Sequence, residues 1–226
     1  MKTSTQVVVI GGGVVGASIL YHLTKAGWTD VVLVERKELT AGSTWHAAGG
    51  MLTLNGDPNI AALQRYTVQL YKDIEEISGV SCGIHQTGEL MLADTEERLD
   101  WLRMINARGQ YLSMETEMIS VSEAKEMLPI LEEKHFAGAM WDPVGGHVDP
   151  SGVTNAYAAA ARMAGAEVYR HTWAHDLVQK NDGTWDVVTE QGTINTEHIV
   201  NCGGLWAREV GRMCGIELPI LAMEHM

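Results

Sequence analysis

The first 35 residues combine two short apolar runs with a stretch of helical spacing between them. QVVVI (6–10) and VVLVE (31–35) have the β-branched composition of strands that are buried on both faces of a sheet. After GGGVVG (11–16), apolar residues recur at helical spacing until about Gly27. The pattern predicts a strand, a glycine turn, a helix and a second strand, which together form one βαβ unit.

The remaining sequence alternates between helical and strand-like segments. Helical apolar spacing, with a proline, threonine or glycine signal at one end, marks 58–78, 95–108, 122–128 and 153–164. Strand-like runs occupy 136–143 and the segment from 166 to 204, where NDG (181–183) and EQG (190–192) predict the tight turns of a meander. We expect GIHQTGELMLA (83–93) to form a hairpin or paired strands around Gly88.

The order of these elements predicts an α/β protein with two interleaved domains. A chain of 226 residues is long enough to bury a full core. We expect one domain to be built from 1–80 and 148–214, and a second from 81–147 and 215–226. The apolar run that stops at Met226 leaves the second domain incomplete, so we expect the chain to be part of a longer protein.

Composition excludes several classes of function. The 16 basic and 29 acidic residues give a net charge of −13, which repels nucleic acid backbones and anionic lipid surfaces. Cys82, Cys202 and Cys214 are odd in number and far apart, so they predict neither a disulfide framework nor a zinc site, and they fit a reducing compartment. The uncharged segment 7–24 contains three consecutive glycines and polar side chains, so we expect neither a membrane span nor a targeting segment.

The glycine turn carries the first chemical signal. Gly11, Gly13 and Gly16 fit GxGxxG between a strand and a helix, and Glu35 ends the second strand 19 residues after Gly16. Such glycines let the backbone turn tightly and approach a pyrophosphate, whose charge the helix N-terminus favours. A carboxylate after the second strand accepts hydrogen bonds from ribose hydroxyls and disfavours NADP. The motif does not distinguish NAD from FAD, and glycines that serve packing alone are the structural alternative.

The segment AGSTWHAAGG (41–50) sets two large rings among very small residues, just beyond the second strand. GST (42–44) can offer N–H groups and hydroxyls to phosphate oxygens. From the residues alone, His46 is either a cofactor contact or a polar loop residue, and packing is the expected role of Trp45.

Other polar residues carry weaker signals. His171 and His175 share a face of an expected strand, but with no third ligand nearby they do not predict a metal site. Ser18 and Ser43 have no partnered base, so a hydrolase triad is not expected.

AGSTWHAAG (41–49), the glycine motif, DGTWDV (182–187) and NCGGLWAREVG (201–211) together resemble the dimethylglycine dehydrogenase family of flavoenzymes. The resemblance covers essentially the whole chain, and it extends to sarcosine dehydrogenases and, more distantly, to D-amino-acid-oxidase-type folds. It implies that the first domain is a Rossmann-like FAD-binding domain of that type, interleaved with an incomplete α+β amine-binding domain. It also implies that His46 is joined covalently to the 8α-methyl of FAD.

The same resemblance assigns further residues. Backbone groups near Ala174 are expected against the adenine, and the glycines that follow the strand HIVNC (198–202) are expected close to the cofactor. His225 is expected on the substrate side of the flavin, as the catalytic residue. The expected cofactor-binding residues are Gly11, Gly13, Val14, Val15, Gly16, Glu35, Arg36, Gly42, Ser43, Thr44, His46, Ala174, Gly203 and Gly204.

The reaction implied by the resemblance is oxidative demethylation of an N-methylated amino acid such as dimethylglycine or sarcosine. A hydride leaves the N-methyl carbon for flavin N5, and the iminium is hydrolysed to formaldehyde or passed to tetrahydrofolate, which would bind in a C-terminal region absent from this chain. The electron acceptor is left open between oxygen and an electron-transfer flavoprotein. We expect no nucleic acid or membrane partner, and a location in the bacterial cytoplasm or, in a eukaryote, the mitochondrial matrix.

Two alternatives stay open from the sequence. The chain also resembles the pyruvate dehydrogenase phosphatase regulatory subunit, a non-catalytic protein of the same fold that lacks the covalent histidine, so the presence of His46 favours an enzyme. An NAD-dependent dehydrogenase could use the same βαβ unit, but it would leave the segment 41–50 without a role.

Overall fold

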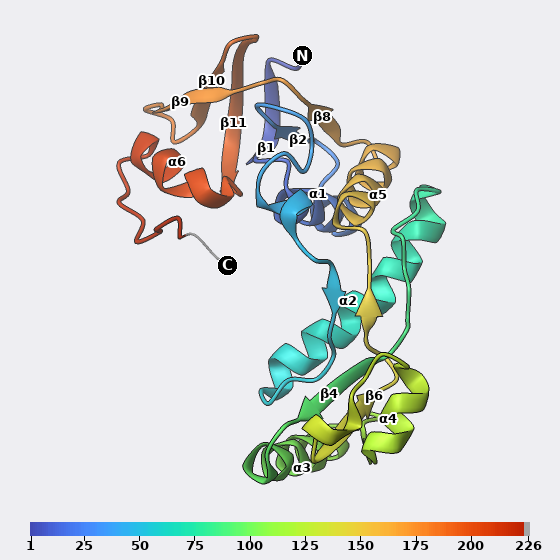
Figure 1. Cartoon of the computed structure of the whole chain (residues 1–226). Helices are drawn as coiled ribbons and strands as arrows, with labels where there is room; N and C mark the ends of the chain where they lie inside the picture. Colours follow the sequence, from blue (N-terminus) through green and yellow to red (C-terminus); the bar gives the residue numbers. More distant parts are fainter. Residues whose placement is uncertain (224–226) are drawn as a thin grey trace. The chain divides into compact units, whose positions relative to one another are not determined.

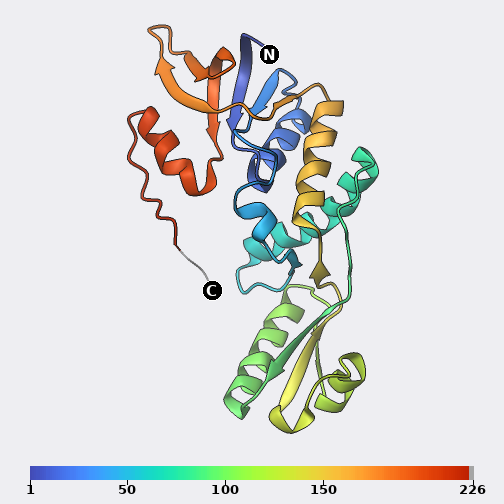
Figure 2. The same ribbon diagram turned by 45° about the horizontal axis from the view of Figure 1, so that its top comes forward.

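A computed structural model describes residues 1–223, which form two compact units (Figures 1 and 2). The first unit comprises Met1–Ala48, Asp73–Cys82 and the chain from Asp149 on, and the second comprises Gly49–Lys72 and Gly83–Val148. This division differs from the predicted domain boundaries, because it places 49–72 with the second unit and 215–223 with the first. Within the described chain, no helix has the length and apolar character that a membrane span requires.

The first unit is built around a six-stranded sheet in the order β8-β2-β1-β11-β10-β9. Its elements are β1 (Ser4–Ile10), α1 (Val14–Lys25), β2 (Val31–Val34), η1 (Ser43–His46), α5 (Pro150–Met163), β8 (Glu167–Tyr169), β9 (Ala174–Gln179), β10 (Trp185–Thr189), β11 (Gly192–Asn201), η3 (Gly204–Trp206) and α6 (Ala207–Met213). β8, β2, β1 and β11 are parallel, whereas β9, β10 and β11 form an antiparallel meander. The predicted βαβ unit and meander are therefore confirmed.

The strand β1 is buried on both faces, which explains its continuous apolar sequence. Val8 and Ile10 belong to a core cluster that includes Val210 of α6. Val7 and Val9 are equally buried and alternate to the opposite face, where α1 packs against β1 and β2 and also against α5. The helices on the two faces thus cover the sheet, and the strand ends stay free to hold a ligand.

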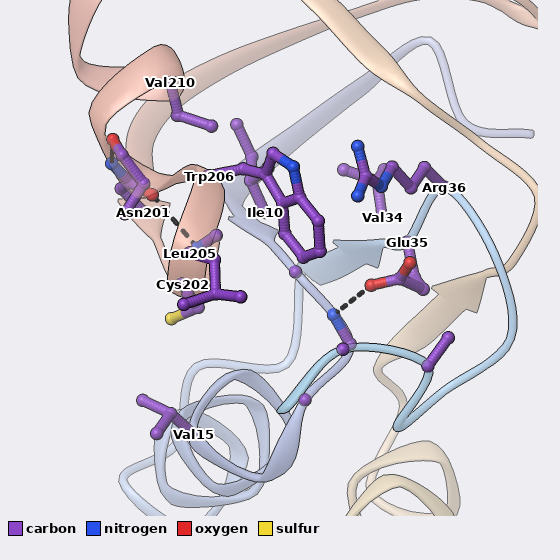
Figure 3. Close-up of a pocket in the computed structure, with 18 of the residues that line it drawn as sticks. Ile10, Val15, Val34, Glu35, Arg36, Asn201, Cys202, Leu205, Trp206 and Val210 are labelled. Atoms are coloured by element: carbon purple, nitrogen blue, oxygen red, sulfur yellow. Dashed lines mark hydrogen bonds between the residues drawn. The ribbon is translucent and has the colours of Figure 1, made fainter. Parts of the chain in front are cut away.

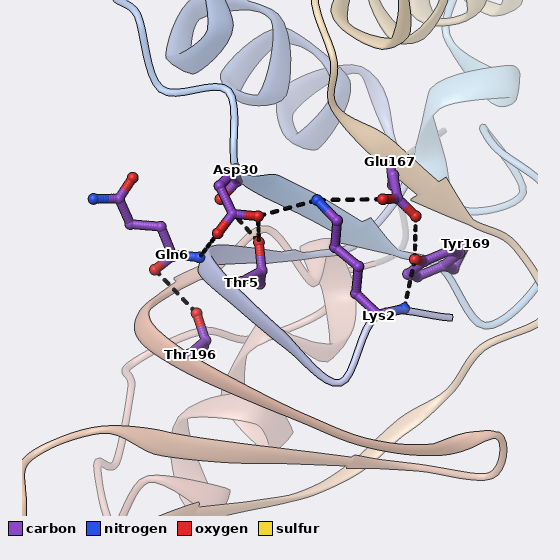
Figure 4. Close-up of polar contacts among 7 residues, drawn as sticks. All are labelled: Lys2, Thr5, Gln6, Asp30, Glu167, Tyr169 and Thr196. Carbon is purple, nitrogen blue, oxygen red and sulfur yellow. Dashed lines mark hydrogen bonds and ion pairs between the residues drawn. The ribbon is translucent and has the colours of Figure 1, made fainter.

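A polar network ties the start of the chain to the edge of this sheet (Figure 4). Lys2 Nζ lies 3.0 Å from Asp30 Oδ1 and 3.2 Å from Glu167 Oε1, and Lys2 N donates to the Tyr169 hydroxyl (2.8 Å). The hydrogen bond from Lys2 is the largest influence that lowers the pKa of Asp30. Because Asp30 precedes β2 and Glu167 lies in β8, the network joins three neighbouring strands at one end of the sheet.

The second unit contains a three-stranded sheet in the order β4-β6-β5 and a two-stranded sheet of β3 and β7. Its elements are β3 (Gly50–Met51), α2 (Pro58–Ser78, whose last part belongs to the first unit), β4 (Glu89–Ala93), α3 (Glu96–Tyr111), β5 (Glu117–Ile119), α4 (Val121–Met127), η2 (Glu133–His135), β6 (Gly138–Asp142) and β7 (Gly146–His147). Successive side chains of β4 point to opposite faces of the three-stranded sheet and so belong to different cores. Met91 packs with Leu102 of α3, whereas Leu92 packs with Ala124 of α4. Thr95 is the N-cap of α3, and its side chain accepts from Arg98 N, which confirms the threonine signal at the start of the predicted helix 95–108.

The prediction that 83–93 pairs with itself around Gly88, as a hairpin or as paired strands, is wrong. β4 pairs antiparallel with β6 instead, with Glu89 opposite Asp142. Gly88 has a φ of +73°, and a Cβ there would lie 1.6 Å from the Trp141 ring, so the glycine makes room for an indole from another strand. The sequence of 83–93 predicted a strand correctly but carried no information about its distant partner.

Glu89 is expected to make the second unit less stable as the pH rises. Burial is the main cause of the raised pKa of this carboxyl, with the charge of Asp142 adding to it, and Glu89 Oε2 is buried without a hydrogen-bond partner. A folded-state pKa above the unfolded value gives stability that is present at low pH and lost as the pH rises through the folded pKa. Glu89→Gln should therefore be more stable than the parent near neutral pH by about 1 kcal/mol.

The measurement is a set of urea titrations from about pH 4, below the ordinary glutamate pKa, to about pH 8. The parent protein should lose stability over this window, and Glu89→Gln should lose less. Glu117→Gln is the matched control, because Glu117 is exposed on β5 of the same sheet. Parallel pH curves for the parent and Glu89→Gln would contradict the prediction.

Candidate cofactor site

Three parallel strands of the first unit end beside one another, and each is followed by residues of the predicted site. Gly11 follows β1, Glu35 follows β2 and Cys202 follows β11. Hydrogen bonds continue the sheet into these turns, from Gly11 N to Val34 O (3.0 Å) and from Cys202 N to Ile10 O (2.8 Å). β2, which follows β1 in the chain, lies on one side of β1 in the sheet, and β11 lies on the other side. The carboxyl ends of these strands therefore form a topological switch point, where α/β sheets bind ligands.

Two glycines of the turn, Gly11 and Gly16, admit no side chain. A Cβ at Gly11, whose φ is +115°, would lie 2.3 Å from Cys202 O, and a Cβ at Gly16 would lie 1.9 Å from Gly11 O. Gly13 is the N-cap of α1 but supplies no side-chain cap, and the first turn of the helix contains no acidic residue. The N–H groups at this helix end therefore depend on acceptors from outside the helix, which makes the position suitable for an anion.

Glu35 is fixed with its carboxylate at the glycine turn (Figure 3). Oε2 accepts from Gly12 N (2.7 Å) and Oε1 accepts from Lys37 N (2.8 Å). These two donors use only part of the acceptor capacity of a carboxylate, so both oxygens can accept further hydrogen bonds. The structure thus holds Glu35 in one orientation and leaves it able to accept from the hydroxyls of a ribose.

The loop 41–48 folds back onto the glycine turn. Thr40 N donates to Gly12 O (2.9 Å), and Thr44 Oγ1 accepts from Val14 N (3.0 Å), the first N–H group of α1. Residues Ser43–His46 form the single 3₁₀ turn η1, and none of them is buried. Hydrogen bonds to the glycine turn, rather than apolar packing, therefore position this loop.

His46 ends η1 with an exposed imidazole. Its Nδ1 lies 3.0 Å from Gly42 O, and since a carbonyl oxygen can only accept, Nδ1 carries the hydrogen and Nε2 of the neutral ring keeps its lone pair. The Trp45 ring packs beside the imidazole with 4.3 Å between the centroids. His46 is thus oriented by its own loop, with its nucleophilic nitrogen directed away from Gly42 O.

The segment after β11 forms the facing wall (Figure 3). Asn201 fixes its turn through both ends of the amide, since Oδ1 accepts from Gly203 N (3.1 Å) and Nδ2 donates to Ala207 O (2.8 Å). The guanidinium of Arg36 lies 3.9 Å from the centroid of the Trp206 ring, a cation–π contact between the segment after β2 and η3. No sequence pattern predicts this pair, because its two members are far apart in the chain.

These segments line one cavity of about 640 Å³ in the first unit. The volume falls within the range of roughly 300–1,000 Å³ that is typical of small-molecule sites. The predicted residues that line it are Gly11, Gly13, Val14, Val15, Glu35, Arg36, Gly42, Ser43, Thr44, Ala174, Gly203 and Gly204. Gly16 packs against Gly11 outside the lining, and His46 adjoins the lining residue Ala47.

Some residues that line the cavity were not predicted from the sequence. These are Trp173 before β9, Cys202 after β11, and Val210 and Met213 of α6. Burial raises the pKa of the Cys202 thiol to about 11, so this side chain is neutral at physiological pH. The helical spacing of α6 could have identified an apolar face, but not the strand ends against which that face lies.

Other predicted residues lie elsewhere. His225, the expected catalytic residue, is outside the described residues. His171 Nε2 lies 2.7 Å from Glu38 Oε1, and the His175 ring lies edge-on to Trp173. Among residues 1–223, no group of three or more histidine, cysteine or carboxylate side chains is arranged to hold a metal ion.

Comparison with known proteins gives consistent matches over nearly the whole chain. Residues 6–225 match the family model described as FAD dependent oxidoreductase. The chain is 41% identical to human mitochondrial dimethylglycine dehydrogenase over 99% of its length, which is 26% of that protein, and 35% identical to human mitochondrial sarcosine dehydrogenase over its full length, which is 25% of that protein. It therefore spans about a quarter of the length of these relatives.

Solved structures agree with these matches. The crystal structure of L-proline dehydrogenase from P. horikoshii superimposes with a TM-score of 0.88 at 30% identity, covering 97% of this chain and 58% of that one. The predicted fold class is therefore confirmed.

Proposed function

Because the chain belongs to the FAD-dependent oxidoreductase family, we propose that the cavity of the first unit binds FAD and that the protein containing this chain oxidises an N-methylated amino acid. The single observation that carries the proposal is the convergence of the glycine turn, Glu35 and the loop bearing His46 on one cavity. The similarity to dimethylglycine and sarcosine dehydrogenases supports the substrate class.

The residues of the cavity fit the parts of a flavin dinucleotide. The N-terminus of α1 lacks a side-chain cap of its own and suits the pyrophosphate, to which Gly13 lets the backbone come close. Glu35 suits the adenosine ribose because it retains acceptor capacity beside the glycine turn. The apolar residues of α6 and the segment at Ala174 suit the adenine. A 2′-phosphate would meet the charge of Glu35, which favours FAD over NADP.

We also propose that His46 holds the flavin covalently. With the hydrogen on Nδ1, the lone pair of Nε2 can form a bond to the 8α carbon of the isoalloxazine. Formation of this bond to His46 would release one C–H proton of the 8α carbon to solvent and leave the electron pair on the flavin, which dioxygen would reoxidise. On the side away from Trp45, Ala47 and Ala48 follow the histidine, and such small side chains leave room for the edge of a large ring.

Bound FAD supplies a two-electron acceptor, so that hydride transfer from an N-methyl carbon leaves an iminium, which water converts to the demethylated amine and formaldehyde. The chain's own residues contribute cofactor binding and orientation to this reaction. Fixing the dinucleotide through the glycine turn, Glu35 and His46 lowers the entropic cost of presenting one flavin face to the amine.

Anaerobic reduction of the bound flavin tests the function. The protein is mixed with dimethylglycine or sarcosine, and bleaching of the visible flavin absorbance is followed. The matched control is trimethylglycine, whose quaternary nitrogen has no lone pair to assist hydride transfer. Bleaching by the first two amines but not by the control supports the proposal. Stable flavin binding with no bleaching by any N-methyl amine would favour the non-catalytic alternative.

Glu35→Ala is expected to weaken non-covalent FAD binding. Loss of hydrogen bonds to a charged acceptor corresponds to about 1.5–3 kcal/mol, or roughly a 10- to 150-fold increase in Kd. The covalent bond would hide this loss, so Kd is measured by flavin fluorescence titration in the His46→Ala background. Glu190→Ala, at an exposed turn of the first unit, serves as the control. An unchanged Kd would remove Glu35 from the site.

A further inference from the structure

We propose that Thr44 is a positioning residue for His46, which couples the phosphate-binding end of α1 to the histidine that attaches the flavin. The inference rests on the proposed covalent attachment. It starts from the way the loop 41–48 is held. No residue of η1 is buried, so apolar packing contributes little to its position. Among the described residues, Thr44 makes the only direct hydrogen bond between this loop and α1, from Val14 N to Thr44 Oγ1 (3.0 Å).

The Thr44 hydroxyl occupies the place where the helix needs an acceptor. Gly13, as N-cap, has no side chain to satisfy the first N–H groups of α1, and Val14 carries one of them. The fit is close, because a Cβ at Gly13 would lie 3.1 Å from Thr44 Oγ1. The hydrogen bond from Val14 N therefore requires an oxygen at this point, because a hydrocarbon group cannot accept it.

The same hydroxyl can also contact the cofactor. A hydroxyl accepts and donates at once, and within the described chain the Thr44 O–H has no acceptor, whereas Thr44 lines the cavity. Its hydrogen is thus available to a phosphate oxygen of the dinucleotide. Thr44 would then touch the helix end and the pyrophosphate together.

His46 moves with Thr44 because both belong to one 3₁₀ turn. Residues in such a turn rise only about 2 Å each, so His46 lies within about 4 Å of Thr44 along the axis. The bond between His46 Nδ1 and Gly42 O, together with the packing of the Trp45 ring, joins the imidazole to the turn rather than to the rest of the unit. The residues of η1 therefore move together, and among side chains the Thr44 hydroxyl holds them to α1. Loss of that hydrogen bond should displace His46 Nε2 without unfolding the sheet.

Attachment should respond strongly to such a displacement. The new bond joins Nε2 to the 8α carbon, whose C–H proton passes to solvent while the electron pair enters the ring and leaves to dioxygen. A misplacement of about 1 Å at a reacting atom can slow a reaction by roughly 100-fold. We expect Thr44→Val to slow attachment by about 10- to 100-fold and Thr44→Ser, which keeps the hydroxyl, to restore most of the rate.

The experiment follows acid-precipitable flavin over time after apo-protein is mixed with saturating FAD in air. Saturation separates the first-order attachment rate from any change in Kd, which is measured separately in the His46→Ala background. Thr193→Val, an exposed threonine of β11, is the control for the valine substitution, and melting temperatures show that each variant is folded.

Slow attachment in Thr44→Val, with recovery in Thr44→Ser, supports the inference. A wild-type rate in Thr44→Val, or an equal loss in Thr44→Ser, overturns it, because the hydroxyl would then not set the rate. If the unmodified protein itself holds no acid-stable flavin, the proposed covalent attachment is wrong, and the role proposed for Thr44 is then wrong as well. That outcome is recognised before any variant is compared.

Discussion

His46→Ala is expected to leave all of the flavin in the supernatant when the loaded protein is precipitated with acid. The unmodified protein should instead keep its flavin in the pellet. The reason is chemical: in the loop 41–48, His46 carries the only imidazole, and the bond to Gly42 O leaves Nε2 with a lone pair. FAD should still bind before denaturation, since the glycine turn and Glu35 are unchanged.

A competing nucleophile makes this experiment more informative. Cys202 lines the cavity, whereas His46 only adjoins it, so proximity alone would favour the thiol. The raised pKa of Cys202, about 11, argues against it, because the thiolate is the reactive form and is scarce at neutral pH. Cys202→Ser should accordingly retain covalent flavin, and His198→Ala, at an exposed histidine of β11, should retain it too. Acid-stable flavin in His46→Ala that disappears in His46→Ala/Cys202→Ser would assign the bond to Cys202.

Local pattern was sufficient to predict the parts of this fold that are themselves local. β1, α1 and β2 are consecutive, their apolar periods are clear, and the glycines between them need a tight turn whatever surrounds them. The turns at NDG and EQG join neighbouring strands for the same reason. Several residues of these segments that line the cavity could therefore be predicted from the local pattern.

Contacts between distant segments could not be predicted in this way. The apolar run in β4 predicts a strand, but its partner β6 lies far away in the sequence, where Trp141 occupies the space that a side chain at Gly88 would need. The Arg36–Trp206 contact and the lining by α6 arise only when β2 and β11 lie on either side of β1. The division at 49–72 likewise depends on long-range contacts, which no composition shift marks.

Gly16→Ala is expected to destabilise the first unit and to abolish FAD binding. The substitution is a sharp test because intrinsic helix propensity predicts the opposite sign: alanine within a helix is favoured over glycine by about 1 kcal/mol. At Gly16, however, the new Cβ would lie 1.9 Å from Gly11 O and 3.1 Å from Gly11 C, which are backbone atoms that no rotamer change can move. The N-terminus of α1 must then shift away from the end of β1.

We expect a loss of about 3 kcal/mol, at the upper end of overpacking costs, and a fall in melting temperature of roughly 6–12 °C. Urea titration measures the first quantity, and flavin fluorescence in the His46→Ala background measures binding. Gly56→Ala is the neutral control, because nothing lies within 4 Å of a Cβ there. Gly13→Ala should be intermediate, since its Cβ would meet only Thr44 Oγ1, at 3.1 Å. If Gly16→Ala were as stable as Gly56→Ala and bound FAD with unchanged Kd, the close contact between α1 and the end of β1 could not be what shapes the proposed pyrophosphate site.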